Sequence, residues 1–110
     1  MNKCHFLGKL TREPNVKKEN NVSVIDFELE IEEFRKDNNK DKVRSVIYLN
    51  FEAWDTAAEA IEKYAKKGSL MAIESVARNY FYEDPNNPEA GEIIETYFRV
   101  TNFKILGFGT

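Results

Sequence analysis

The stretch Asn50–Ser75, NFEAWDTAAEAIEKYAKKGSLMAIES, decides how this chain folds. Apolar and polar residues alternate up to Trp54, which predicts a strand, and Ala57–Lys67 has the apolar spacing of a short helix. Gly68 predicts the end of that helix, and the apolar residues after it predict another strand. This succession indicates a small β-rich domain that carries one helix.

The expected helix has signals at both ends. Thr56 and Glu59 have the spacing of a capping box, in which each side chain bonds a free backbone amide at the helix start. Lys66 and Lys67 suit the negative end of the helix dipole, directly before Gly68. The apolar face expected to pack on the domain consists of Ala57, Ala60, Ile61 and Tyr64.

Alternation on both sides of this stretch predicts five strands, Lys3–Leu10, Ser23–Phe34, Ser45–Trp54, Ser69–Tyr82 and Glu92–Leu106. Gly8 in the first strand predicts a bulge or a sharp bend. The inward residues are expected to be Ile25, Phe27, Leu29 and Ile31 in the second strand, Ile47, Leu49, Phe51 and Ala53 in the third, Met71 and Ile73 in the fourth, and Phe98 and Val100 in the fifth.

The connections between the strands are polar. A turn is expected over Asn15–Asn21, and a hairpin loop with two prolines over Glu83–Gly91. Arg35–Arg44, RKDNNKDKVR, holds five basic and two acidic residues and predicts a positive, flexible hairpin tip. Three strands, a helix and two strands predict an all-β protein in the main, a five-stranded OB-fold barrel with one helix between strands three and four. A β-sandwich is disfavoured because only five strands are expected.

Length and composition limit the class of protein. At 110 residues the chain is expected to form one domain over residues 1–106, with a short frayed end at 107–110. The net charge of −3 does not indicate nucleic-acid binding, although an acidic protein can carry a local basic groove. The single cysteine, Cys4, suits a reducing compartment. No apolar run is long enough to cross a membrane and no signal-peptide pattern is present, so we expect a cytoplasmic protein.

The opening Met1–Pro14, MNKCHFLGKLTREP, and the stretch EAWDTAAEAIEKYAKKGSL together resemble bacterial-type and phage-type single-stranded DNA-binding proteins. The resemblance extends to Leu106. It implies a homotetramer, or at least a homodimer paired through the first strand, that binds single-stranded DNA with little sequence preference during replication, recombination or repair. No nucleotide fingerprint, zinc spacing or catalytic pattern accompanies the only histidine, His5, so we expect no enzymatic activity, no cofactor and no metal.

Binding of this kind needs flat rings for the bases and positive charge for the phosphates. The resemblance places stacking aromatic residues at Trp54, Tyr48, Tyr82 and Phe34, and basic contacts at Lys9, Arg12 and Arg78. Tyr80 interleaves with Arg78 and is a further candidate platform, although cross-strand aromatic pairing explains it nearly as well. The hairpin adds candidate phosphate contacts, with a solvated mobile loop as the alternative, at Arg35, Lys36, Lys40, Lys42 and Arg44.

Three departures from the family pattern keep other functions open. Glu32 and Glu33 stand where many relatives carry basic or neutral residues, and Ser75 replaces a usual glycine. The chain also stops at Thr110, where relatives continue into an acidic tail that recruits replication proteins. The alternatives are therefore a primosome-type accessory protein of the same fold, or an OB-fold protein-interaction module with weak or no DNA binding.

Overall fold

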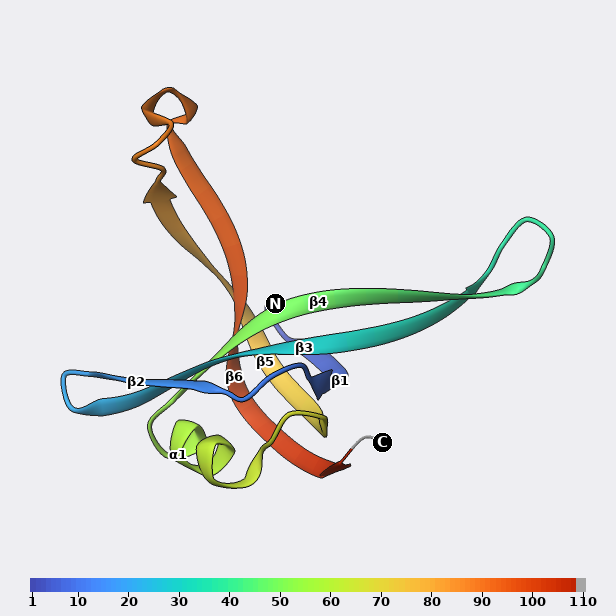
Figure 1. The fold of residues 1–110 in the computed structure, drawn as a ribbon, viewed down its shortest axis with the longest axis horizontal. Coiled ribbons are helices and arrows are strands. Elements are labelled where there is room, and N and C mark those ends of the chain that lie inside the picture. Colours follow the sequence, from blue (N-terminus) through green and yellow to red (C-terminus); the bar gives the residue numbers. More distant parts are fainter. Residues whose placement is uncertain (109–110) are drawn as a thin grey trace.

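The computed structural model describes residues 1–108, which form six strands and one α-helix (Figure 1). In chain order the elements are β1 (Cys4–Leu10), β2 (Asn15–Glu19), β3 (Val22–Lys36), β4 (Lys42–Trp54), α1 (Asp55–Tyr64), β5 (Ser69–Glu83), a short 3-10 helix (Pro88–Ala90) and β6 (Glu92–Phe108).

Five of the strands close into a ring. The hydrogen-bonded order is β1-β5-β6-β4-β3, and β3 returns to β1 through the pairs Lys9–Glu30 and Leu10–Leu29. The short β4–β6 pairing is parallel and the other pairings are antiparallel. A five-strand ring with α1 between its third and fourth strands is the architecture that the sequence predicts.

The hydrophobic core fills the inside of this ring. All four inward residues predicted for β3 are buried, as are Phe51 and Ala53 of β4 and Met71 and Ile73 of β5. The rings of Phe27 and Phe51 stack at 5.3 Å between centroids, and Phe6 meets Phe51 edge-on at 5.5 Å. Val100 is buried and Phe98 packs at the edge of this cluster, so the inward face of β6 is confirmed.

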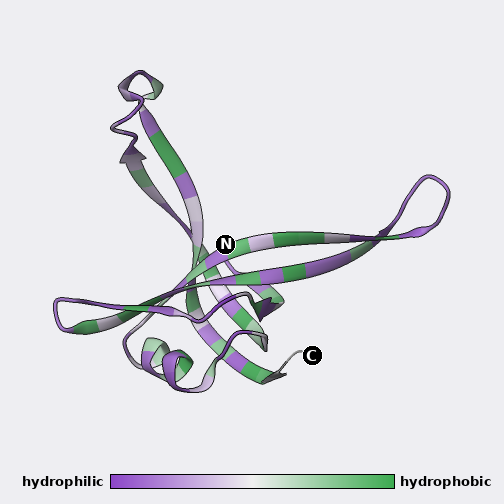
Figure 2. Ribbon diagram, viewed as in Figure 1, coloured by the Kyte–Doolittle hydropathy of each residue, from purple (hydrophilic) through white to green (hydrophobic). Residues whose placement is uncertain are grey.

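Two hairpins extend beyond the ring and diverge from it (Figure 1). We call residues 32–46 the β3–β4 arm and residues 78–97 the β5–β6 arm. Antiparallel pairing continues along each arm, as far as Lys36–Lys42 in the first and Glu83–Glu92 in the second. Figure 2 shows a hydrophilic tip on the β3–β4 arm. Ile47, directly beside the base of the β3–β4 arm, was predicted to lie in the core but is exposed.

The connections differ from their predictions. The expected turn over Asn15–Asn21 is wrong, because Asn15–Glu19 forms β2, which pairs with β3 outside the ring. Only Asn20 and Asn21 turn, both with positive φ. The loop expected over Arg35–Arg44 shrinks to residues 37–41, where Asp37 Oδ1 accepts the amides of Asn39 and Asp41. At the carboxyl end β6 continues to Phe108, and residues 109–110 of the predicted frayed end lie outside the described residues.

The helix is shifted from its predicted position. It begins at Asp55, directly after β4, with Trp54 as N-cap and no capping side chain, so the Thr56–Glu59 capping box is wrong. It ends at Tyr64 because Ala65 is extended, and Gly68 lies in the following turn, where its amide donates to Leu10 O. The buried helix residues are Ala58 and Ile61, whereas Tyr64 is 57% exposed. The predicted apolar face is therefore wrong at Tyr64.

Gly8 has a different role from a bulge. Pairing of β1 with β5 is regular through Gly8, and the register shifts lie in β5, at Leu70/Met71 and Glu74/Ser75. A Cβ at Gly8 would lie 2.7 Å from Glu30 O and 2.9 Å from Ile31 Cγ1. Gly8 is thus required where β1 approaches β3 to close the ring.

Candidate nucleic-acid interface

Exposed aromatic rings lie on the outer face of β3 and β4. In the antiparallel register Tyr48 is opposite Glu30 and Phe34 is opposite Arg44, so alternation brings both rings to the face that points away from the core. Tyr48 is 58% exposed and Phe34 is 55% exposed. The ammonium of Lys42 lies over the Phe34 ring, 4.3 Å from its centroid. This face therefore offers two solvent-accessible rings with a cation beside one of them.

The same face carries carboxylates, and two of the candidate cations are held by them. Arg44 donates from Nε to Glu32 Oε1 at 2.6 Å and from Nη2 to Glu30 Oε1 at 3.3 Å, and the bond to Glu32 is the main reason that its pKa is raised. Arg12 lies 4.0 Å from Glu28. Exposed pairs of this kind add little stability, so their main effect is on the charge of the face.

Other basic residues of the β3–β4 arm are free of such partners. Within residues 1–108, none of the ion pairs involves Arg35, Lys36 or Lys40. These side chains lie at or near the tip, and Lys42 lies over the Phe34 ring. The positive charge available to an incoming phosphate is therefore concentrated at the end of the arm rather than along its length.

Trp54 lies at the end of β4 and is partly buried. Its indole N–H donates to Glu52 Oε1, which also accepts from Arg99 Nη2 at 3.1 Å. The Arg99 guanidinium lies over the indole, 5.3 Å from the ring centroid. Buried Arg99 Nε has no hydrogen-bond partner in the described part of the chain. Trp54 is thus already engaged by charged neighbours, unlike Tyr48.

A second aromatic group occupies one face of the β5–β6 arm. Tyr80 and Tyr82 stack with centroids 5.7 Å apart and planes at 23°, and both hydroxyls donate to Glu95, at 2.5 and 2.9 Å. Tyr97 is 6.0 Å from Tyr80 and is opposite Arg78 in the register. The cross-strand alternative for Tyr80 describes its contacts well, and the residue is still 45% exposed.

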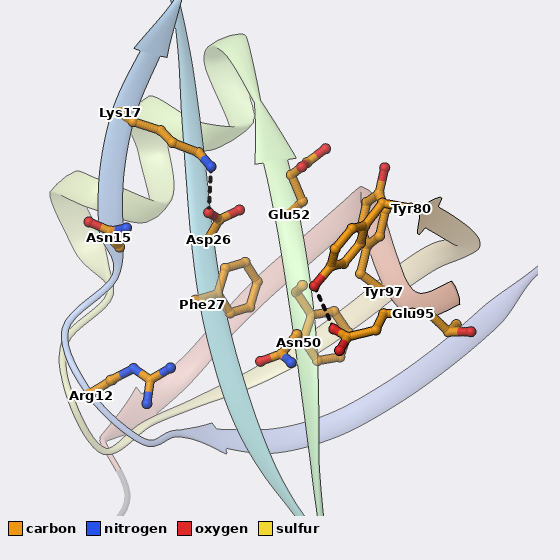
Figure 3. Close-up of a pocket in the computed structure, with 12 residues that line it drawn as sticks. Arg12, Asn15, Lys17, Asp26, Phe27, Asn50, Glu52, Tyr80, Glu95 and Tyr97 are labelled. Atoms are coloured by element: carbon orange, nitrogen blue, oxygen red, sulfur yellow. Dashed lines mark hydrogen bonds and ion pairs between the residues drawn. The ribbon is translucent and has the colours of Figure 1, made fainter. Parts of the chain in front are cut away.

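An open groove of about 670 Å³ connects this arm to the ring (Figure 3). Tyr80, Tyr97 and Glu95 lie on one side of it, and Arg12, Asn15 and Lys17 lie on the other, with Asn50 between them. Lys17 forms a 2.9 Å ion pair with Asp26, and this hydrogen bond raises the pKa of Lys17. The groove is therefore walled by aromatic rings, amides and paired charges.

The predicted residues fall into two groups. Phe34, Tyr48 and the basic residues from Arg35 to Arg44 share the β3–β4 arm and the adjoining face, and Arg78, Tyr80 and Tyr82 share the β5–β6 arm. Arg12 lines the groove, and the backbone of Lys9 pairs with Glu30 beside Tyr48. The sequence reasoning missed Tyr97, Glu95 and Asn50. For Tyr97 the available signal was its position one residue before inward Phe98, which gives it the outward parity.

No group of three or more histidine, cysteine, aspartate or glutamate residues within residues 1–108 is arranged to hold a metal ion. In the same range, no helix has the length and apolar character needed to span a membrane.

Comparison with known proteins identifies the relatives of this chain. The Synechocystis protein "Single-stranded DNA-binding protein 1" is 32% identical over 110 residues, which cover 97% of this chain and 84% of the relative. The Bacillus cereus single-stranded DNA-binding protein is 30% identical over 97 residues, covering 86% of this chain and 56% of the relative.

Solved structures share the fold at lower identity. "Plasmodium falciparum SSB complex with ssDNA" superposes with a TM-score of 0.84 at 19% identity and covers 96% of this chain and 95% of that one. A deletion mutant of the Thermus aquaticus single-stranded DNA binding protein has a TM-score of 0.83, also at 19% identity, and covers 96% of this chain and 50% of that one. These likenesses establish the predicted OB-type fold.

The model of the single-strand binding protein family matches residues 1–104. That match includes α1, both arms, the residues that line the groove, and the strands of the ring as far as residue 104. It agrees with the prediction of a binding protein rather than an enzyme. The chain belongs to the single-strand binding protein family.

Proposed function

We propose that the chain binds and protects single-stranded DNA with little sequence preference, by base stacking and phosphate neutralisation. The observation that carries this proposal is the set of solvent-accessible rings on the outer face of β3–β4, in a member of the single-strand binding protein family. Stacking on such rings tolerates any base because every base has a π face.

Each group of residues has a part in the proposed mechanism. Tyr48 and Phe34 stack bases along β3–β4, and Tyr80 and Tyr82 stack bases on the other arm. Trp54 offers only the part of its ring that Arg99 leaves open. Phosphates are neutralised at the arm tip by Arg35, Lys36, Lys40 and Lys42, and along the strand by Lys9, Arg12, Arg44 and Arg78. Bound DNA then competes with Glu28 for Arg12 and with Glu30 and Glu32 for Arg44.

We further propose that residues 1–106 act as the DNA-binding domain of a homotetramer or homodimer. The exposed Leu7 on the outer face of β1, the strand through which the family resemblance implies pairing, supports this. An oligomer also lengthens the surface available to a strand. Because the relatives are bacterial DNA-binding proteins, we propose that the chain works in the cytoplasm during replication, recombination or repair, where replication proteins are candidate partners.

A protein-interaction module with weak DNA binding is the second candidate. The row of carboxylates beside Tyr48 favours it, since Glu28, Glu30 and Glu32 repel a phosphate backbone. A titration separates the two functions. Labelled oligo-dT, followed by fluorescence anisotropy at moderate salt, should be bound by the intact chain, and sedimentation should give a mass above that of a monomer. Absence of binding at low salt would favour the interaction module.

The stacking role of Tyr48 has its own test. Tyr48→Ala should weaken oligo-dT binding by roughly 5- to 150-fold, the equivalent of about 1–3 kcal/mol for one stacked base. Tyr64→Ala is the matched control, because Tyr64 is exposed to almost the same extent but lies on α1, away from both arms. Equal affinities for the two variants, with both folded, would remove Tyr48 from the interface.

A further inference from the structure

We propose that Tyr82, Tyr80 and Tyr97 form a continuous stacking track for single-stranded DNA that runs along the β5–β6 arm into the groove. We also propose that Glu95 is the positioning residue that holds this track in shape. The inference rests on the proposed function and adds Tyr97 and Glu95 to it.

The three rings follow one another on a single face of the arm. Tyr80 and Tyr82 are two residues apart on β5, and their rings lie nearly parallel with centroids 5.7 Å apart. Tyr97 comes from the neighbouring strand and lies 6.0 Å from Tyr80 at a tilt of 52°. Tyr80 and Tyr97 both line the groove, as Figure 3 shows, whereas Tyr82 lies further toward the arm tip. The rings thus lead from the arm to the ring of strands.

Glu95 ties the outer two rings together from the opposite strand. It is directly across from Tyr80 in the register, and its two carboxylate oxygens each accept a hydrogen bond from a different tyrosine hydroxyl. These bonds, the one from Tyr80 first, lower the pKa of Glu95, so the carboxylate stays ionised at neutral pH. A tether at the hydroxyl end restricts both torsions of an exposed tyrosine side chain before any ligand binds.

The same bonds decide how the tyrosines can meet DNA. Each hydroxyl has one proton to donate, and Glu95 takes it from both Tyr80 and Tyr82. Neither hydroxyl is left to donate to a phosphate, so these side chains have mainly their ring faces to offer. Arg78 is opposite Tyr97 and belongs to none of the ion pairs within residues 1–108, so it supplies positive charge beside the track.

The direction in which Glu95→Ala changes DNA affinity distinguishes a positioning role of Glu95 from a purely electrostatic one. A carboxylate near a phosphate backbone is repulsive, so its removal should tighten binding if charge were its only influence. If Glu95 holds the track, Glu95→Ala should weaken binding although it removes a negative charge. We expect a loss of roughly 2- to 12-fold, the range for one ordinary hydrogen bond. Glu95→Gln, which keeps one acceptor oxygen, should lie between wild type and Glu95→Ala.

The opposite face of the same arm provides the control for Tyr97. Phe81 and Ile94 are paired across the strands on that face, and Phe81 is 57% exposed. Tyr97→Ala should weaken oligo-dT binding by roughly 5- to 150-fold, as expected for a lost stacking platform, whereas Phe81→Ala should leave it unchanged. Thermal melting of each variant checks that the fold persists.

Photo-crosslinking supplements the affinity measurements with information on which residues contact the bases. Oligo-dT carrying 5-iodouracil should photo-crosslink to Tyr97 in the wild-type chain, with adducts located by peptide mass spectrometry. The Glu95→Ala variant should give fewer adducts at Tyr80 and Tyr82, and Phe81 should give none. A merely structural role for Glu95 would change the melting temperature without changing this pattern.

The outcomes are distinct. The stacking track is overturned if Glu95→Ala binds more tightly than wild type, or if Tyr97→Ala binds equally well and Tyr97 forms no adduct. In either case the proposed function stands as long as the wild-type chain binds oligo-dT. Failure of the wild-type chain to bind oligo-dT overturns both.

Discussion

Arg44 should gain a phosphate contact when its carboxylate partners are removed. It is held by Glu32 at 2.6 Å and by Glu30 at 3.3 Å, on the same face as Phe34 and Tyr48. In Glu30→Gln/Glu32→Gln the guanidinium loses both ionic partners, and the face loses two negative charges. We therefore expect tighter binding of single-stranded DNA at low salt.

The salt dependence gives the magnitude. Each neutralised phosphate on a single strand adds about −0.7 to the slope of log affinity against log salt. With one new phosphate contact from Arg44, the loss of affinity between about 50 and 200 mM salt should be roughly 2.5-fold greater in the variant than in wild type. The assay is oligo-dT titration by fluorescence anisotropy across that range, with wild type and variant measured side by side.

A charge-matched control isolates Arg44 from net charge. Glu33→Gln/Asp41→Asn also removes two negative charges from the β3–β4 arm region, but Glu33 alternates to the other face and neither residue forms an ion pair within residues 1–108. This variant should bind somewhat tighter without the extra slope. Identical slopes for the two double variants would show that Arg44 contacts no phosphate, and the strand would then pass elsewhere.

Two further predictions concern the fold and the tyrosine track. Gly8→Ala should lower stability by about 1–3 kcal/mol, because its Cβ would lie 2.7 Å from the backbone oxygen of Glu30 at the ring closure; a melting temperature equal to that of wild type would contradict this. The near-UV circular dichroism of the tyrosines should be constant from neutral pH down to about 5 and should change only below 4.5, the usual pKa of glutamate. The reason is that the tyrosine hydroxyls lower the pKa of Glu95, and the stabilisation from these hydrogen bonds is lost when Glu95 is protonated. Glu95→Gln should show no such acid transition, and an unchanged transition in that variant would show that Glu95 is not its source.

The strands were predictable wherever one face of them is buried. Ile25 and Leu29 follow a period of two because the core lies on one side of β3. The same reasoning failed at Ile47, which lies at the base of the β3–β4 arm and is exposed. It also missed β2, whose five residues are all exposed and therefore show no alternation. The helix ends were misplaced because tertiary contacts, such as the Gly68 amide bonding Leu10 O, outweigh local capping signals.

The site was predictable in its single residues but not in its pairings. The family resemblance indicated Tyr48 and Phe34 as candidate rings, and both lie on an exposed face. The bond between Arg44 and Glu32 depends on the register across the hairpin, and the register depends on where residues 37–41 turn. Sequence alone leaves that turn open, because every residue from Arg35 to Lys42 is polar. Glu95 escaped for the same reason, since only the β5–β6 register brings it to Tyr80.

The divergence of the two arms has a thermodynamic consequence for any ligand they hold. A two-stranded ribbon lacks the third neighbour that makes a sheet independently stable, so the arms fall among the elements that open most easily. A ligand that orders such a ribbon binds less tightly, because its binding free energy must offset the conformational entropy that the ribbon loses. Contacts within the arms, such as Lys42 on Phe34 and Glu95 with Tyr80 and Tyr82, already order part of each ribbon when the chain folds. The chain thus places these cross-strand contacts where preorganisation of the free protein improves affinity for a ligand.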